Sequence, residues 1–344
     1  MASIPSRDYE ELARVFGVVQ EAERLGGGGG AAFYRMLLDG IRAYVVHSPE
    51  GVELASMPEI VGGDMASRSR RAARHAVRLM EELGLEERVV LLHILRGSPG
   101  YEVSGALDEV AEVDNIYIRV KYDEQSYRDH REREARAVYT KAGPLSGGRY
   151  TLVVADTVAT GRSMVEALSR GLQVLDFKGI TLSGVYIYGF ISLPGARMVA
   201  EAVKGQGIEP VFISIEDFSA LSSNMYDMPL YGPDPADPGR LLGAAAPPEA
   251  FQGMLPHYFP GMDQPGDWSE RQCLLFNGVG YERGDVAGHL RRSLEMLEEL
   301  HRVSSGMEWY RDWMEDVYAA RRRGLEEALR GDPCGGARST EAQI

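Results

Sequence analysis

Residues 152–163 read LVVADTVATGRS. An apolar run ends in an acid, Asp156, and a turn rich in hydroxyls follows. The next residues, MVEALSRGL at 164–172, have the character of a helix. The pattern predicts a buried strand, a turn and a helix. Ligands of an open parallel sheet bind beyond the carboxyl ends of its strands. We therefore expect Asp156 to lie at a ligand site.

The turn after Asp156 favours a phosphate. The N–H groups at the start of a helix have no partner within the helix, and the helix dipole adds partial positive charge there. Thr157, Thr160 and Ser163 supply hydroxyls, and Gly161 allows a close backbone approach. The carboxylate suits a neutral hydrogen-bond donor such as a sugar diol, so the two together indicate a sugar phosphate. The alternative is a purely structural role, in which Asp156 and Thr160 only cap the helix.

Strands and helices alternate on both sides of this stretch. Strands are expected at 43–48, 88–95, 115–122, 150–156, 180–191 and 209–217, and helices at 7–25, 64–84, 162–174 and 195–204. The run RVVLLHIL at 88–95 is apolar throughout, which is typical of a parallel strand covered on both faces. The pattern predicts an α/β fold with a mostly parallel sheet. Helical spacing returns at 286–330, and the glycine run at 26–30 is expected to be a flexible connection or a disordered loop.

Composition excludes several classes of protein. The chain has 344 residues, of which 44% are hydrophobic, and a formal net charge of −14. This charge argues against general binding to nucleic acid or to anionic membranes. The longest apolar run is short and broken by Ser, Gly and Pro, so it favours a buried strand over a membrane span. Cys273 and Cys334, the only two cysteines, suggest no disulfide framework, and a reducing cytoplasm fits them.

Five segments resemble the type I phosphoribosyltransferases, and most of all uracil phosphoribosyltransferase. They cover about residues 88–243 and occur in the family's order. VVADTVATGRS resembles the signature for phosphoribosyl pyrophosphate. LLHILRGSPGYEVSGAL resembles the strand and pyrophosphate loop, IRVKYDEQSY with AVYTKAGPL the hairpin over the site, and FISLPGARMVAEAV the next strand and helix. The segment ISIEDFSALSSNMYDMPLYGPD with GRLLG resembles the uracil-binding segment.

The resemblance implies a set of site residues. Asp156 and Arg96 take the catalytic positions. The substrate-binding positions are Gly97, Ser98, Lys121, Thr157, Val158, Ala159, Thr160, Gly161, Arg162, Ser163, Tyr226, Met228, Pro229, Gly232 and Asp234. Mg²⁺ is expected to ride mainly on the pyrophosphate, and no protein ligand for it is predicted. Each motif also has an ordinary interpretation: RGSPG as a strand-end turn, the 226–234 loop as one packed by its own Met and Tyr side chains.

The resemblance also organises the chain. Residues 1–87 are expected to complete the core of the domain at 88–243, residues 244–330 to form a loop-rich and then helical extension, and residues 331–344 to form a disordered tail. The charged segment 121–136 is either a mobile flap over pyrophosphate or a solvated hairpin or helix. We further expect a homo-oligomer, most simply a dimer.

Two departures from the family keep the function open. Ala155 stands where the family has the first of two acids, and Arg162 stands where it usually has glycine. The leading prediction is transfer of ribose 5-phosphate from phosphoribosyl pyrophosphate to a nucleobase, with uracil as one candidate. The alternative is a non-catalytic regulator or sensor that binds the sugar diphosphate or a nucleotide. A third interpretation is an assembly protein that uses its C-terminal helices as an interface.

Overall fold

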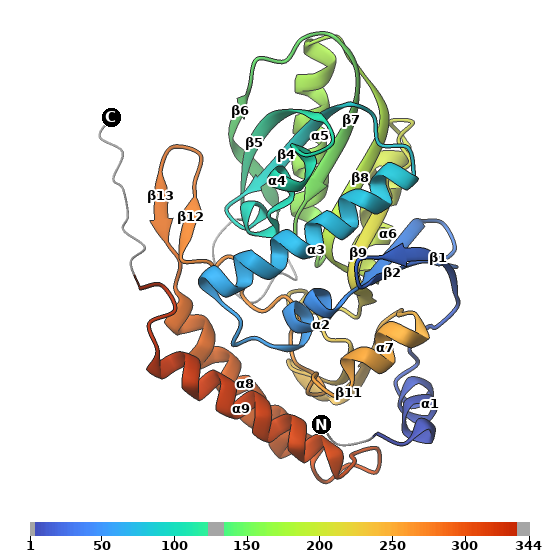
Figure 1. Ribbon diagram of the computed structural model, residues 1–344, viewed down its shortest axis with the longest axis vertical. Coiled ribbons are helices and arrows are strands. Elements are labelled where there is room, and N and C mark those ends of the chain that lie inside the picture. Colours follow the sequence, from blue (N-terminus) through green and yellow to red (C-terminus); the bar gives the residue numbers. More distant parts are fainter. Residues whose placement is uncertain (1–3, 123–133, 336–344) are drawn as a thin grey trace.

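The computed structural model describes residues 4–122 and 134–335 of the chain. These residues form an α/β fold around a nine-stranded, mostly parallel sheet, with a helical C-terminal region (Figure 1). The strands of this sheet are β1 (Ala22–Gly28), β2 (Ala31–Met36), β3 (Arg42–His47), β4 (Arg88–Leu95), β5 (Glu112–Tyr122), β6 (Ala135–Ala142), β7 (Gly148–Ala155), β8 (Ile180–Ser192) and β9 (Val211–Ser219).

The remaining elements are helices and two small hairpins. The helices are α1 (Ser6–Val15), α2 (Pro49–Ser56), α3 (Gly62–Glu82), α4 (Val103–Leu107), α5 (Arg162–Phe177), α6 (Leu193–Lys204), α7 (Pro248–Met254), α8 (Val286–Ser304) and α9 (Trp313–Arg330), with a 3₁₀ turn at Ser98–Tyr101. One hairpin pairs β10 (Tyr231–Asp234) with β11 (Asp237–Gly243), and the other pairs β12 (Leu274–Phe276) with β13 (Tyr281–Arg283).

The order of the strands places a crevice between β4 and β7. The sheet runs β1-β2-β3-β9-β8-β7-β4-β5-β6, and the strands from β3 through β5 are parallel. From β4 the chain moves to β5 on one side, whereas β7 lies on the other side and leads outward to β8 and β9. The direction of winding therefore reverses between β4 and β7. At such a switch point the loops leave the sheet in opposite directions and open a ligand crevice.

The apolar side chains of the central strands form two core layers, one on each face of the sheet. Successive side chains of a strand point to opposite faces of a sheet. Leu91 and Val153 join one apolar cluster with residues of α3, whereas Leu92 and Val154 join another with residues of α5 and α6. Figure 1 shows α3 crossing one face of the sheet, with α5 and α6 beyond the other. Both faces are covered, which explains why these strands are apolar throughout.

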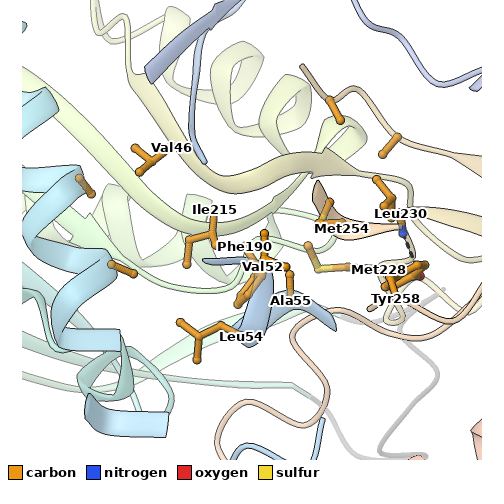
Figure 2. Packing of buried hydrophobic residues seen from close by; sticks show 14 of the residues in the cluster. Val46, Val52, Leu54, Ala55, Phe190, Ile215, Met228, Leu230, Met254 and Tyr258 are labelled. Atoms are coloured by element: carbon orange, nitrogen blue, oxygen red, sulfur yellow. Dashed lines mark hydrogen bonds between the residues drawn. The ribbon is translucent and has the colours of Figure 1, made fainter. Parts of the chain in front are cut away.

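The C-terminal region packs against the same core as the sheet. Figure 2 shows apolar side chains of β3, β9 and α2 continuing into Met228, Leu230, Met254 and Tyr258. The backbone N–H of Leu230 donates to Tyr258 Oη over 3.0 Å, drawn there as a dashed line. Helices α8 and α9 lie side by side, and both helices and Trp309 in the connection between them add apolar side chains to this cluster. The extension is therefore part of the folded body.

Arg271 joins the extension to the connection between α2 and α3. Its side chain has no exposed surface, and in the described part of the chain it donates only to backbone carbonyls. The acceptors are Ile60 O at 3.1 Å from Nε, Leu54 O and Pro265 O at 3.0 and 3.2 Å from Nη1, and Met57 O and Ile60 O at 3.3 and 2.9 Å from Nη2. Burial lowers the pKa of Arg271 to about 10, so the guanidinium stays charged at neutral pH. The segment around Arg271 is held in place by these bonds.

Three sequence expectations near the N-terminus and at the cysteines are wrong. Helix α1 ends at Val15, and the glycine run belongs to the end of β1 and its tight turn into β2. The amphipathic pattern of 7–25 predicts a helix to residue 25, but pairing with β2 overrides that local pattern. Cys273 and Cys334 form a disulfide with a Cα–Cα distance of 5.5 Å, which removes the argument for a reducing compartment.

Two expectations concern segments at the limits of the described residues. Residues 331–335 are ordered instead of belonging to a disordered tail, since the disulfide at Cys334 ties them to Cys273. Residues 336–344 lie outside the described part. Strands β5 and β6 form the antiparallel hairpin that the sequence predicts. Most of the charged segment 121–136, namely residues 123–133, also lies outside the described residues.

Replacing Arg271 by leucine should destabilise the protein by roughly 3 kcal/mol or more, because several buried carbonyls lose their hydrogen bonds together. Urea unfolding measures this loss. The matched control is Arg302→Leu, since Arg302 is 70% exposed and, among the described residues, pairs only with Glu299. That control should change the free energy of unfolding by about 0.5 kcal/mol or less. Equal effects of the two substitutions would contradict the role given to Arg271.

Candidate functional site

A cavity of about 340 Å³ opens at the crevice between β4 and β7. Its walls come from Tyr226 and from four longer parts of the chain. These are the end of β4 and its loop, the last residues of β5, the turn between β7 and α5, and the segment 263–270 of the C-terminal extension. Asp156, Arg96 and Gly97 all line it, so the two sequence motifs predicted to bind one ligand do lie together.

The turn between β7 and α5 has the geometry of an anion cradle. Gly161 precedes α5 with φ 82°, a conformation that favours glycine. A Cβ there would lie 2.8 Å from Val199 Cγ2 and 2.9 Å from Gly195 O. Among the described residues, the N–H groups of Ala159, Thr160 and Gly161 have no hydrogen-bond acceptor. These groups, together with the dipole of the sixteen-residue α5, favour a phosphate oxygen at this end of the helix.

Two of the three predicted hydroxyls are held by tyrosines. Thr157 Oγ1 lies 2.6 Å from Tyr101 Oη, and Ser163 Oγ lies 2.6 Å from Tyr122 Oη. Thr160 Oγ1 accepts from the backbone N–H of Arg162 over 3.4 Å. Tyr101 is buried beneath the turn, whereas Tyr122 lines the cavity. The two tyrosines hold the turn in position. No sequence motif predicts this role for them.

Asp156 sits at the base of the cavity with a strongly perturbed acidity. Burial raises the pKa of Asp156 to about 8, although a hydrogen bond from the Thr157 backbone opposes the shift. A ligand hydroxyl that donates to the carboxylate would favour its ionised form and lower this pKa again. The residue before it, Ala155, is 2% exposed and packs in the same apolar cluster as Tyr101. Ala155, which stands where the phosphoribosyltransferase signature has its first acid, is therefore a residue of the apolar core.

Arg96 faces two carboxylates of the extension. Its Nη1 donates to Glu282 Oε2 over 2.9 Å, and its Nη2 lies 3.7 Å from Glu270 Oε1. The peptide bond between Leu95 and Arg96 is cis. Gly97 lines the cavity, and its carbonyl accepts from Gln272 Nε2 over 3.2 Å. An anionic ligand next to Arg96 must therefore share the guanidinium with these acids.

Several residues predicted for the site lie outside the cavity. Lys121 is exposed, and because side chains alternate along β5 it points away from the face that carries Val120 and Tyr122. Val158 is 1% exposed in the core, and Ser98 is buried. Arg162 is half-buried at the start of α5 but does not line the cavity. In contrast, Ala159, Thr160, Gly161 and Ser163 do line it.

The segment predicted to bind uracil contributes only Tyr226 to the cavity. Met228 is fully buried, and Pro229 and Gly232 lie in the core of the loop and hairpin. Asp234 uses its carboxylate for the turn itself, since it accepts from the backbone N–H groups of Ser223 at 2.8 Å and Ala236 at 2.9 Å. The ordinary interpretation, a loop packed by its own side chains, describes most of this segment.

Sequence reasoning missed the wall that the extension supplies. Trp268, Ser269 and Glu270 line the cavity, and Trp268 stacks on Tyr101 with ring centroids 4.4 Å apart. Tyr226 Oη donates to Asp267 Oδ1 over 3.2 Å, which joins this wall to the 226–234 loop. The stretch DQPGDWSE at 263–270 has no periodicity, and its only signal is one tryptophan among acids.

No group of three or more His, Cys, Asp or Glu side chains in residues 4–122 and 134–335 could hold a metal ion. Over the same residues, no helix is long and apolar enough to cross a membrane.

The comparisons with known proteins find only weak similarity. No family model matches the chain, and neither does any curated protein. Among solved structures, the chain is similar to an adenine phosphoribosyl transferase from Trypanosoma brucei in complex with AMP, pyrophosphate and ribose-5-phosphate. The identity is 15%, with 52% of this chain and 85% of that chain covered and a TM-score of 0.32.

Two further solved structures show the same level of similarity. A hypoxanthine phosphoribosyltransferase from Staphylococcus aureus is 9% identical, over 44% of this chain and 76% of that one, with a TM-score of 0.30. An APRTase from Giardia lamblia complexed with 9-deazaadenine is 12% identical, over 62% and 97%, with a TM-score of 0.30. At these values the likeness decides neither fold nor activity, which rest on this chain's own residues.

Asp156→Asn should alter how stability depends on pH. The folded acid titrates near pH 8 and the unfolded acid near its ordinary value of 3.8. Between these values the folded state holds a proton that the unfolded state has lost, so stability falls as pH rises through this window. Asparagine has no proton to lose. The variant should match the wild type near pH 4 and melt a few degrees higher near pH 8.

Thermal unfolding of the ligand-free protein from pH 4 to pH 8.5 makes this measurement. Asp176→Asn, at an exposed position of α5, is the matched control and should follow the wild-type curve. Parallel curves for the wild type and Asp156→Asn would show that Asp156 ionises normally.

Proposed function

We propose that this protein is a phosphoribosyltransferase, which transfers ribose 5-phosphate from phosphoribosyl pyrophosphate to a nitrogen of a nucleobase and releases pyrophosphate. The observation that carries the proposal is the pairing of an anion cradle at 159–161 with a partly buried acid, Asp156, inside one cavity. That pairing matches a ligand with a phosphate at one end and vicinal hydroxyls beside it. The ordered sequence motifs at 88–243 support the same ligand.

The two ends of the ligand have separate partners in this proposal. The 5-phosphate binds the N–H groups of Ala159, Thr160 and Gly161 at the start of α5. The ribose hydroxyls donate to Asp156. The pyrophosphate lies toward Arg96 and Gly97 at the end of β4. Positioning of the sugar between the two loops, together with stabilisation of the departing pyrophosphate, would provide most of the catalysis.

Mg²⁺ belongs to this proposal as a companion of the pyrophosphate. The donor set fits a hydrated ion better than a directly bound one, because Asp156 and Glu270 line different walls of the cavity. Carboxylates placed in this way can accept hydrogen bonds from metal-bound water. The ion would offset the negative charge of the pyrophosphate beside Glu270 and Glu282.

The acceptor is proposed only as a nucleobase. Tyr226 and Trp268 border the cavity and offer aromatic surface next to polar groups, as planar ligands require. Uracil remains the candidate that the sequence motif suggests. However, Met228, Pro229, Gly232 and Asp234 lie away from the cavity, which weakens the reason for preferring uracil over another base.

A binding protein without turnover is the second candidate. Two observations favour it: Ala155 replaces an acid with core packing, and Arg96 is already engaged by Glu282. A sensor needs only contacts with the bound ligand, whereas an enzyme must also stabilise the transition state. A sensor would bind phosphoribosyl pyrophosphate or a nucleotide in the same cavity.

Incubation with phosphoribosyl pyrophosphate, Mg²⁺ and a panel of purine and pyrimidine bases distinguishes the two candidates. The enzyme is expected to form a nucleoside monophosphate and pyrophosphate, both detectable by mass spectrometry. A sensor would form no product, yet phosphoribosyl pyrophosphate would raise its melting temperature by mass action. Neither product nor thermal shift would contradict both candidates.

Gly161→Ala should weaken binding of ribose 5-phosphate by roughly tenfold or more, because the cradle must shift to relieve the contacts with Val199 and Gly195. The matched control is Gly179→Ala. Gly179 also has a positive φ, 66°, but a Cβ there meets nothing within 4 Å. Both variants carry the same kind of backbone strain, so calorimetry at a temperature where both are folded isolates the cradle. Equal affinities for the two variants would place the phosphate elsewhere.

A further inference from the structure

The main chain of Gly97 borders a small space inside the cavity where three side chains converge. A Cβ added to Gly97 would lie 3.1 Å from Ser269 Oγ, 3.6 Å from Trp268 Cδ1 and 3.7 Å from Asp156 Oδ1. All four residues line the cavity. The hydroxyl of Ser269 and the carboxylate of Asp156 therefore both approach the cavity beside Gly97, close enough for one ligand oxygen next to the glycine to contact both.

Ser269 has a hydroxyl available for such a contact. It is partly buried, and in the described part of the chain its Oγ has no hydrogen-bond partner. It is also held firmly. Trp268 before it stacks on Tyr101, and Arg271 after it is fixed by backbone carbonyls. A positioned donor costs little further ordering when a ligand binds.

The chemistry of the two groups selects the ligand atom. In its ionised form, which a donating ligand hydroxyl favours, Asp156 only accepts hydrogen bonds, whereas a serine hydroxyl can donate one. An atom between them must therefore donate to Asp156 and accept from Ser269. A hydroxyl does both, whereas a phosphate oxygen would meet the carboxylate with like charge.

We propose that Ser269, from the C-terminal extension, donates a hydrogen bond to a ribose hydroxyl that Asp156 holds from the opposite side. The inference rests on the proposed function and adds a specificity residue to it. Ala155 leaves Asp156 as the only acid of its motif, and Ser269 supplies the second polar contact to the sugar. The extension thereby contributes to recognition of ribose.

The contact is tested by changing the serine in the protein and, separately, each hydroxyl in the ligand, and by asking whether the two effects depend on each other. Calorimetry compares ribose 5-phosphate with its 2-deoxy and 3-deoxy analogues, on the wild type and on Ser269→Ala. Ser269→Ala should weaken binding of ribose 5-phosphate by roughly two- to tenfold, as expected for one neutral hydrogen bond. For one of the two deoxy analogues the same substitution should have no effect. The control Ser305→Ala, at an exposed position, should leave all three affinities unchanged.

Gly97→Ala tests whether the ligand occupies the space beside Gly97. Gly97 has φ −71°, which alanine adopts without strain, so the added methyl should fill the point between Ser269 and Asp156 while the fold is kept. Affinity for ribose 5-phosphate should fall roughly tenfold or more, because the displaced hydroxyl loses both partners. Gly105→Ala, where a Cβ meets nothing within 4 Å, is the control. Melting temperatures of all variants confirm that each is folded.

The outcomes separate this inference from the proposed function. If the wild type binds ribose 5-phosphate and Ser269→Ala binds it equally well, the contact is wrong and the proposed function stands. A loss that is the same for all three sugars would also overturn the contact, since it would reflect structure alone. If the wild type binds none of the sugar phosphates, the proposed function fails and this inference fails with it.

Discussion

A guanidinium with no exposed surface, that of Arg271, connects the C-terminal extension to the part of the molecule that contains the sheet. Arg271 is charged at neutral pH, and it replaces the water it has lost with carbonyls from the α2–α3 connection and from its own segment. A buried charge is tolerated only when every donor is satisfied in this way. The requirement fixes the path of the chain on both sides of Arg271, and so it fixes where the extension meets the sheet.

The functional consequence is a cavity that the sheet alone would not enclose. The switch point between β4 and β7 brings Arg96 and Asp156 together, as strand order dictates. The extension then adds Trp268, Ser269 and Glu270 as a facing wall. His289 strengthens this arrangement by donating from Nε2 to Pro58 O over 2.8 Å, next to the carbonyls that Arg271 uses. The site thus depends on contacts between segments more than 200 residues apart in the sequence.

Local pattern predicted the central parallel strands of the sheet and several of the residues that line the cavity. Apolar runs such as 88–95 reveal buried parallel strands, and the acid-turn-glycine sequence after β7 reveals the cradle because backbone geometry is local. The wall at 263–270 could not be predicted, since its position follows from the buried bonds of Arg271. Lys121 shows a second limit: it lies on the predicted hairpin, but the alternation of β5 turns its side chain away from the cavity. The glycine run was misread because strand pairing with β2 overrides local flexibility.

The central claim is that the start of α5 binds the phosphate of a ribose whose hydroxyls reach Asp156. A crystal structure with ribose 5-phosphate tests it most directly. The account predicts phosphate oxygens within hydrogen-bond distance of the N–H groups of Ala159, Thr160 and Gly161, and ribose hydroxyls beside the Asp156 carboxylate. A sugar phosphate bound with its phosphate at Arg96 and no contact to Asp156, or bound outside this cavity, would contradict the account.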